Sequence, residues 1–346
     1  MAAWALSDAV LMDFDNYTVI DNLYMRVDIC DVMAMGATCK RGRVLWIEYR
    51  GRQYNMNKML ATHVGDTTTF RSLMDATHSV IVGPCLTNFL RRNPTAPHSL
   101  AVVVNINSLA RFKSYLENFE GYAAWVGEEQ TQAKGEGIES TRRRSARTGL
   151  RSGALSVAAA GRLEDPIQNV ITMERKTDGN PTTYIILTTA RTCVAKTLMT
   201  PVTTMAANFM TANTIVSLYP RATFITQVGY RVYRKLGIRL WSVPSMTHAP
   251  YGYTRPRAVA TEAACKYLNV DGGWAQERYL GDGQSWVLHY DVEGNNTGNA
   301  NTSVREREAW VYGSQWRTRV ENGNVYMDVR KAILAATEGV PDIGFV

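Results

Sequence analysis

Arginines gather in one segment of the chain, where they could contact phosphate groups. Residues 128–164 contain few large apolar side chains and no aromatic ones. The segment is therefore predicted to be a linker or a long exposed loop. Flexible arginine-rich segments bind nucleic-acid phosphates by counterion release, whereas many runs of charge are only solvated loops. The predicted contact residues here are Arg142, Arg143, Arg144, Arg147 and Arg151.

A second basic cluster is predicted at residues 219–244. Large apolar residues recur every four positions from Thr223 to Leu236, which predicts a helix. After Gly237 the apolar residues alternate, which predicts a strand that ends at Pro244. A solvated face is the alternative to a binding role for the positive patch. The patch consists of Arg231, Arg234, Lys235 and Arg239.

This helix and strand resemble a segment of a known protein family. The matching residues are Tyr230, Tyr233, Leu236, Ile238, Leu240, Val243 and Pro244. In this arrangement the segment is similar to the one before an inner strand of the coat proteins of small icosahedral RNA viruses. The resemblance covers about 25 of the 346 residues and transfers no individual residue role. It implies a self-assembling capsid subunit, found in the virion and, during assembly, in the host cytoplasm.

Aromatic residues near the second basic cluster are candidates for contacts between subunits. Tyrosine, tryptophan and arginine dominate the energetics of protein interfaces, and the alternative is that these rings are simply core. The candidate interface residues are Trp241, Tyr251, Tyr253 and Trp274.

The best enzyme-like signal is the pair Asp13 and Asp15, which follows an apolar run. This D-x-D pattern resembles the first motif of haloacid-dehalogenase-type phosphotransferases, in which the first aspartate is the nucleophile. The chain departs from that motif at Asn16 and Tyr17, and no convincing lysine or acidic metal motif follows. The five histidines and five cysteines show no metal-ligand spacing. The sequence therefore predicts no enzyme, no cofactor and no metal site.

The charge of the chain favours a nucleic-acid or interface role. The formal net charge is +7, and 29 of the 38 basic residues are arginine. Arginine pairs bidentately with phosphate and stacks on bases, although genome composition can produce the same bias. The odd number of cysteines without C-x-x-C pairs predicts reduced, structural thiols. The chain has no apolar stretch long enough to span a membrane, so no membrane partner is predicted.

The pattern along the chain predicts an α+β fold. Residues 1–127 are expected to form a mixed α/β domain, 128–165 a linker, and 166–346 a β-rich domain such as a β-sandwich or jelly roll. In the first region, residues 44–49 are predicted to be a strand of a short hairpin, and residues 100–106 a buried strand. A helix capped by Ser108 and stopped at Gly121 is expected next.

Further elements are predicted in the C-terminal region. Residues 170–175, 182–188 and 286–292 are expected to be strands, and residues 205–218 a helix. Asn322-Gly323 predicts a hairpin between residues 316–321 and 325–327. A final helix is expected to begin at Asp328.

The leading hypothesis from the sequence is a viral capsid subunit that contacts copies of itself, other viral structural proteins and RNA. One alternative is a nucleic-acid-binding protein that does not assemble, which would use the same arginines. The other is a phosphotransferase that uses Asp13 and Asp15.

Overall fold

The computed structural model describes about half of the chain, in several stretches. These are residues 21–24, 35–36, 38–92, 99–125, 167–176, 181–190, 203–225, 228–230, 232–233, 254–257, 276–280, 282, 285–297, 315–321 and 324–331. Helices and a large mixed sheet are both present, so the predicted α+β class is confirmed. Among the described residues, none of the helices combines the length and apolarity that a membrane-spanning helix requires.

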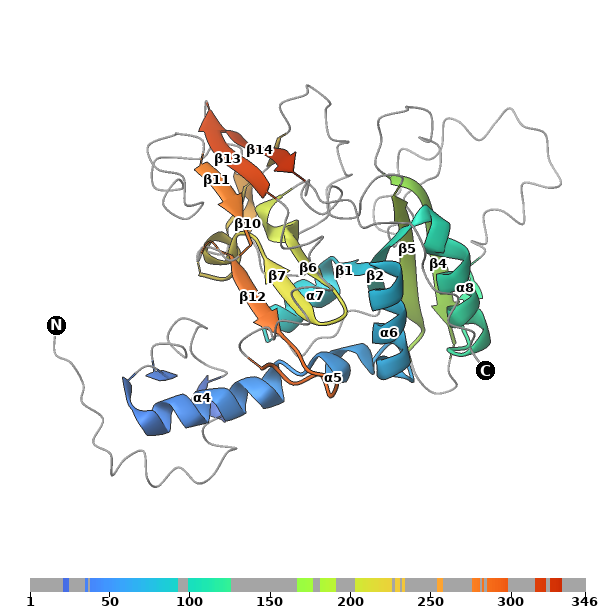
Figure 1. The fold of residues 1–346 in the computed structure, drawn as a ribbon, viewed down its shortest axis with the longest axis horizontal. Helices are drawn as coiled ribbons and strands as arrows, with labels where there is room; N and C mark the ends of the chain where they lie inside the picture. Colours follow the sequence, from blue (N-terminus) through green and yellow to red (C-terminus); the bar gives the residue numbers. More distant parts are fainter. Residues whose placement is uncertain are drawn as a thin grey trace.

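An eight-stranded sheet forms the centre of the molecule (Figure 1). Its strands, in spatial order, are β12 (Trp286–His289), β7 (Thr214–Ser217), β6 (Asn208–Met210), β1 (Val80–Val82), β2 (Ser99–Asn105), β5 (Thr183–Ala190), β4 (Ile167–Arg175) and β3 (Ala123–Ala124). Neighbours are antiparallel except β2 and β5, which are parallel. The sheet takes strands from both sides of the predicted 128–165 linker. The described parts of the two predicted domains therefore share one sheet and one core.

Within the described parts of the chain, four helices pack into or beside the core of this sheet. They are α5 (Met56–Leu60), α6 (Thr67–Thr77), α7 (Pro84–Leu90) and α8 (Leu109–Asn118). Helix α7 contacts β1, β2 and β6, and α8 contacts β2. A fifth helix, α4 (Lys40–Gln53), extends away from the sheet at the lower left of Figure 1.

The predicted unit of strand and helix around residue 105 is confirmed by β2 and α8. Leu100, Val102 and Val104 are buried in the core, as are Phe112 and Leu116 of α8. Gly121 follows the helix at φ +70°, the left-handed conformation predicted for the stop. The predicted capping role of Ser108 is wrong, because its side chain makes no cap hydrogen bond. The side chain of Asn105 instead accepts from Asn107 N at the preceding turn η1 (Ile106–Ser108).

The strand predicted at residues 44–49 is wrong, because these residues lie inside helix α4. Leu45 and Tyr49 are four residues apart and both are buried, which is the spacing of one helical face. Their packing outweighs the strand preference of the β-branched and aromatic residues in this run.

The helix predicted at residues 205–218 is also wrong. These residues form β6 and β7, an antiparallel hairpin in which Thr211 N donates to Thr214 O at 2.8 Å. All four residues of β7 are buried, and the strand is hydrogen-bonded to β6 on one side and β12 on the other. The apolar residues of this segment are irregularly spaced, so their period alone does not distinguish a helix from two short strands.

The helix predicted from Thr223 to Leu236 extends only to Ile225, as the helical turn η4 (Arg221–Ile225). Strands β8 (Val228–Tyr230) and β9 (Val232–Tyr233) follow it. Gly229 lies so close to Met205 that an added Cβ would be 2.3 Å from its Sδ. Pairing of β8 with residues 254–257 and of β9 with residues 325–326 holds this backbone extended, where the apolar period alone suggested a helix.

The remaining described strands form two small sheets. One has the order β11 (Gln276–Tyr279), β13 (Gln315–Glu321), β14 (Asn324–Lys331), β9, and the other pairs β10 (Thr254–Arg257) with β8. The predicted hairpin is confirmed, with Glu321 opposite Asn324. The helix start predicted at Asp328 is wrong, because Asp328 pairs with Arg317 in this ladder. Where described, the C-terminal strands belong to three sheets, the largest of which also contains β1, β2 and β3 from the N-terminal region.

Candidate nucleic-acid interface

The site residues predicted from the sequence lie outside the described residues. This holds for both basic clusters, for the candidate interface aromatics and for the phosphotransferase pair. The residues concerned are Arg142, Arg143, Arg144, Arg147, Arg151, Arg231, Arg234, Lys235, Arg239, Trp241, Tyr251, Tyr253, Trp274, Asp13 and Asp15. Their roles stay predictions.

Helix α4 is the most basic element that the structure describes. Its sequence, KRGRVLWIEYRGRQ, contains five basic residues and only one acidic residue, Glu48. The helix begins after Cys39, whose Sγ accepts a hydrogen bond from Gly42 N at 3.2 Å. Gly42 is required there, because an added Cβ would lie 2.6 Å from the backbone oxygen of Met35.

One face of α4 is held by a small aromatic cluster. The rings of Tyr24 and Tyr49 meet edge to face at 4.9 Å between centroids, and Leu45 packs with them. The guanidinium of Arg92 donates to Tyr24 O at 2.6 Å and to the Tyr49 hydroxyl at 3.0 Å. These contacts fix the rotation of α4 and determine which residues face outward.

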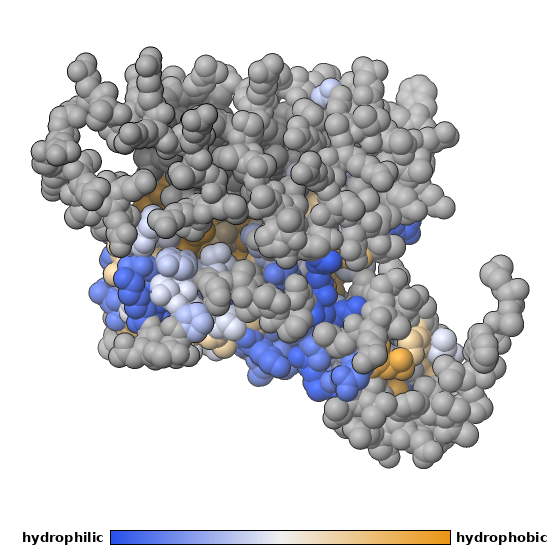
Figure 2. All heavy atoms as spheres, turned by 180° about the vertical axis from the view of Figure 1, so that it is seen from behind, coloured by the Kyte–Doolittle hydropathy of each residue, from blue (hydrophilic) through white to orange (hydrophobic). Residues whose placement is uncertain are grey.

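The outward face of α4 combines cations with apolar side chains. Lys40, Arg41 and Arg43 are exposed, and so are Val44 and Ile47, at 44% and 46% of their full accessibility. Figure 2, seen from behind, shows hydrophilic residues along the lower part of the molecule and a smaller hydrophobic patch beside them, on the side to which α4 extends. This face is suited to a partner with both negative charge and flat apolar groups.

The charges at the start of α4 oppose the helix dipole. The first turn of a helix favours acidic residues, because its free N–H groups carry partial positive charge. Here the first turn contains Lys40 and Arg41 and has no acidic residue. A sequence that breaks such a local rule at a surface often does so for function.

The last turn of α4 follows the dipole rule. Arg50 and Arg52 lie there, near the negative end of the helix. The Arg50 guanidinium lies 5.9 Å from the centre of the Trp46 ring, and its partial burial lowers its pKa below the ordinary value. Arg52 forms two hydrogen bonds with the carboxylate of Asp21, at 2.6 and 3.1 Å. Its charge is therefore paired within the protein.

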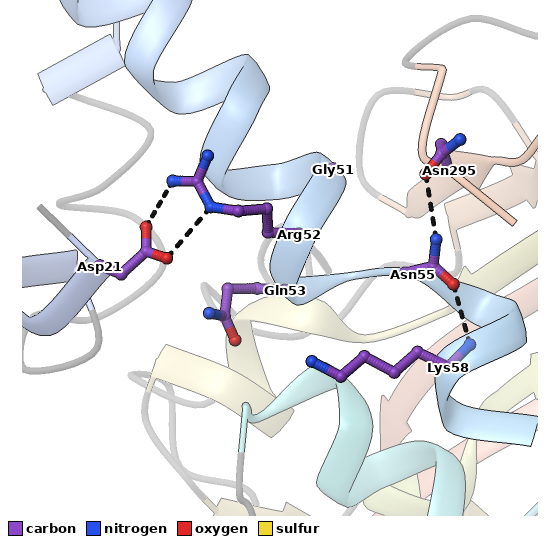
Figure 3. A pocket seen from close by; sticks show the side chains of 7 residues that line it. All are labelled: Asp21, Gly51, Arg52, Gln53, Asn55, Lys58 and Asn295. Carbon is purple, nitrogen blue, oxygen red and sulfur yellow. Dashed lines mark hydrogen bonds and ion pairs between the residues drawn. The ribbon is translucent and has the colours of Figure 1, made fainter. Parts of the chain in front are cut away.

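A shallow, open pocket of about 520 Å³ lies at the C-terminal end of α4 (Figure 3). It is lined by Asp21, Gly51, Arg52, Gln53, Asn55, Lys58 and Asn295. Asn55 connects two of its walls, since its amide accepts from Lys58 N at 2.8 Å and donates to Asn295 Oδ1 at 3.0 Å. The side chain of Lys58 extends from α5 toward that of Gln53.

The buried Arg71 of α6 anchors the loop that forms the far wall of this pocket. Its guanidinium donates to Asp291 O at 2.7 Å and to Val292 O at 3.0 Å. It also donates to Ala212 O at 2.7 Å, in the turn between β6 and β7. Met56 N donates to Gly294 O at 2.8 Å, which ties the same loop to α5. The pocket walls are thus fixed to the core of the protein.

Among the described residues there is neither a group of metal ligands nor a reactive thiol at Cys85. They contain no group of three or more His, Cys, Asp or Glu side chains able to hold a metal ion. Burial raises the pKa of Cys85 to about 12, so this thiol is protonated at neutral pH and is a poor nucleophile.

Comparisons with protein-family models, with curated proteins and with solved structures found no match to this chain. The candidate interface therefore depends on the geometry of α4 and its pocket. The sequence contained a usable signal for it, because Arg43 and Arg50 are seven residues apart, which places both on one helical face. Because residues 44–49 were predicted to be a strand, Arg43 and Arg50 were not expected to share one face of a helix.

Proposed function

We propose that this chain binds the phosphate backbone of nucleic acid along helix α4. The observation that carries the proposal is the exposed cationic first turn of this helix, where Lys40, Arg41 and Arg43 oppose the helix dipole. A phosphate bound there stabilises both the side-chain charges and the helix end. The formal net charge of +7 adds long-range attraction for a polyanion.

The spacing of the cations supports contact with several phosphates. Arg43 and Arg50 are separated by seven residues, which is about 10.5 Å along a helix. Val44 and Ile47 lie on the same outward face and can contact sugars or base surfaces between the phosphates. Contacts of this kind supply affinity and position but carry little sequence information.

A charge-matched pair of variants tests the proposal. Fluorescence anisotropy with a labelled oligonucleotide at low salt compares K40A/R43A with K113A/K176A. Lys113 lies on α8 and Lys176 directly follows β4, at the other end of the molecule from α4 (Figure 1). We expect K40A/R43A to lose about tenfold in affinity and the control to bind like the parent chain. Equal effects of the two variants would contradict a role for α4.

Self-assembly into a viral capsid stays a prediction from the sequence. Of the residues that carry the resemblance, Tyr230 and Tyr233 lie in strands β8 and β9, and the other five lie outside the described ranges. Negative-stain electron microscopy of the purified protein at physiological salt tests it. Regular shells, rings or lattices would support a capsid subunit that also binds nucleic acid. Uniform small particles would favour the binding protein that does not assemble.

A further inference from the structure

The pocket at the end of α4 has two polar groups directed into the space between α4 and α5. Gln53 contributes a side-chain amide from the last residue of α4, and Lys58 contributes an exposed ammonium group from α5. Figure 3 shows both side chains approaching the same space. The last three residues of α4, Gly51, Arg52 and Gln53, line the pocket, so it lies at the end of the helix along which a strand would bind.

We propose that this pocket takes one nucleotide of a single strand, with its phosphate at Lys58 and its base edge at Gln53. This inference rests on the proposed function of α4. An amide presents one donor group and one acceptor group side by side, which matches the paired donor and acceptor of a base edge. Bases in a duplex already use their pairing edges, so the pocket favours an unstacked base of a single strand.

The charge of the pocket matches a phosphate within a polymer. Its charged lining residues are Asp21, Arg52 and Lys58, and the paired Arg52 and Asp21 neutralise each other. One positive charge therefore remains, which balances the single negative charge of a phosphodiester. A free nucleoside triphosphate carries several negative charges, and the pocket lacks the cations to balance them.

Gly51 marks the open side of the pocket. A Cβ added at this position would meet no atom within 4 Å. Glycine inside a helix lowers its stability, and Gly51 lies within the last turn of α4. A larger residue here would occupy part of the pocket and at the same time favour the helix, so steric blocking can be separated from misfolding.

The test compares Gly51→Leu with the small control Gly51→Ala. Anisotropy measures binding to labelled oligodeoxyadenylate and to its duplex with oligodeoxythymidylate. We expect Gly51→Leu to lose about tenfold in affinity for the single strand, to retain duplex binding, and to unfold at a temperature no lower than that of the parent chain. Gly51→Ala should bind both like the parent chain. Lys58→Gln and Gln53→Leu should weaken single-strand binding in the same selective way.

Three outcomes would overturn the inference in distinguishable ways. In the first, Gly51→Leu binds the single strand as tightly as the parent chain while K40A/R43A binds it more weakly. This would contradict the role of the pocket and leave the proposed function of α4 intact. In the second, the parent chain binds neither the single strand nor the duplex, which would contradict both the role of the pocket and the proposed function. Displacement of the single strand by adenosine monophosphate at a concentration comparable to that of the strand's nucleotides would assign the pocket to a free nucleotide.

Discussion

The β2–α8 unit and helix α4 differ in how far their apolar side chains are buried. In β2 and α8 the large apolar residues Leu100, Val102, Phe112 and Leu116 are buried in one core. In α4 only part of the apolar surface is buried, and Val44 and Ile47 remain exposed among cations. The first element follows the rules of stability throughout, whereas the second departs from them at its outward face. That difference is the reason for proposing a binding role for α4.

The largest effect is expected in the core. Phe112 is fully buried, and its ring meets that of Phe70 edge to face at 5.6 Å. We expect Phe112→Ala to lower the free energy of unfolding by about 3–5 kcal/mol, because it removes apolar contacts and leaves a cavity. Urea unfolding measures this loss. Phe119→Ala, at a position 65% exposed directly after the same helix, should lower stability by no more than about 1 kcal/mol, since its ring stacks on Tyr115 but is mostly exposed.

The next largest effect is expected at Arg71, which joins the core to the loop beside the pocket. Arg71→Met keeps the length of the side chain but removes the donor to two carbonyl oxygens of this loop and to Ala212 O in the β6–β7 turn. We expect a loss of about 3 kcal/mol in unfolding free energy. Hydrogen exchange should also become faster at residues 292–297. Unchanged exchange in this loop would show that Arg71 does not hold the pocket wall.

A smaller effect, dependent on pH, is expected at the N-terminus of α6. The carboxylate of Asp66 accepts from the Thr69 hydroxyl and from the N–H groups of Thr68 and Thr69, which lowers its pKa below the ordinary value. Because the folded pKa is depressed, this stabilisation is present above the unfolded pKa and is lost as the pH falls through the folded pKa.

Asp66→Ala should therefore lower stability by about 1 kcal/mol at neutral pH. Urea unfolding at neutral pH and near pH 3 measures the difference between parent and variant, which should shrink in acid. Asp66→Asn, which keeps an acceptor oxygen at every pH, should remove most of the pH dependence. A difference that grows in acid would contradict the capping role.

The smallest effect on stability is expected at the first residue of α4, where stability and binding oppose each other. Lys40→Glu places a negative charge at the positive end of the helix dipole and should raise the free energy of unfolding by about 0.3–1 kcal/mol. The same change should weaken nucleic-acid binding. Lys40→Gln should lie between the parent chain and Lys40→Glu in both measurements. If Lys40→Glu raised both the stability and the nucleic-acid affinity, the inferred opposition between stability and binding at this residue would be contradicted.

Local signals in the sequence were sufficient where neighbouring residues determine the structure. The apolar run at residues 100–106 predicts β2, and Asn322-Gly323 predicts the hairpin of β13 and β14. The signals failed where distant packing decides between helix and strand. Residues 44–49 become helical because Leu45 and Tyr49 pack on Tyr24. Residues 208–210 and 214–217 become strands because they pair with β1 and β12 of the central sheet.

The candidate site was less predictable than the fold. Its cations are visible in the sequence, but they form one surface only when α4 is a helix. The pocket brings Asn55 together with Asn295, which lies 240 residues later in the chain, and Arg71 binds Asp291 across 220 residues. No local pattern encodes contacts over such separations.

The salt dependence of binding tests the account of α4 most directly. Anisotropy titrations with a labelled single strand over a series of salt concentrations give the slope of log Kobs against log salt for the parent chain, K40A/R43A and K113A/K176A. If Lys40 and Arg43 each contact a phosphate, the slope of K40A/R43A should be shallower by about 1.4, at about 0.7 for each contact. K113A/K176A should keep the parent slope. A parent slope retained by K40A/R43A would contradict the claim that α4 binds the phosphate backbone.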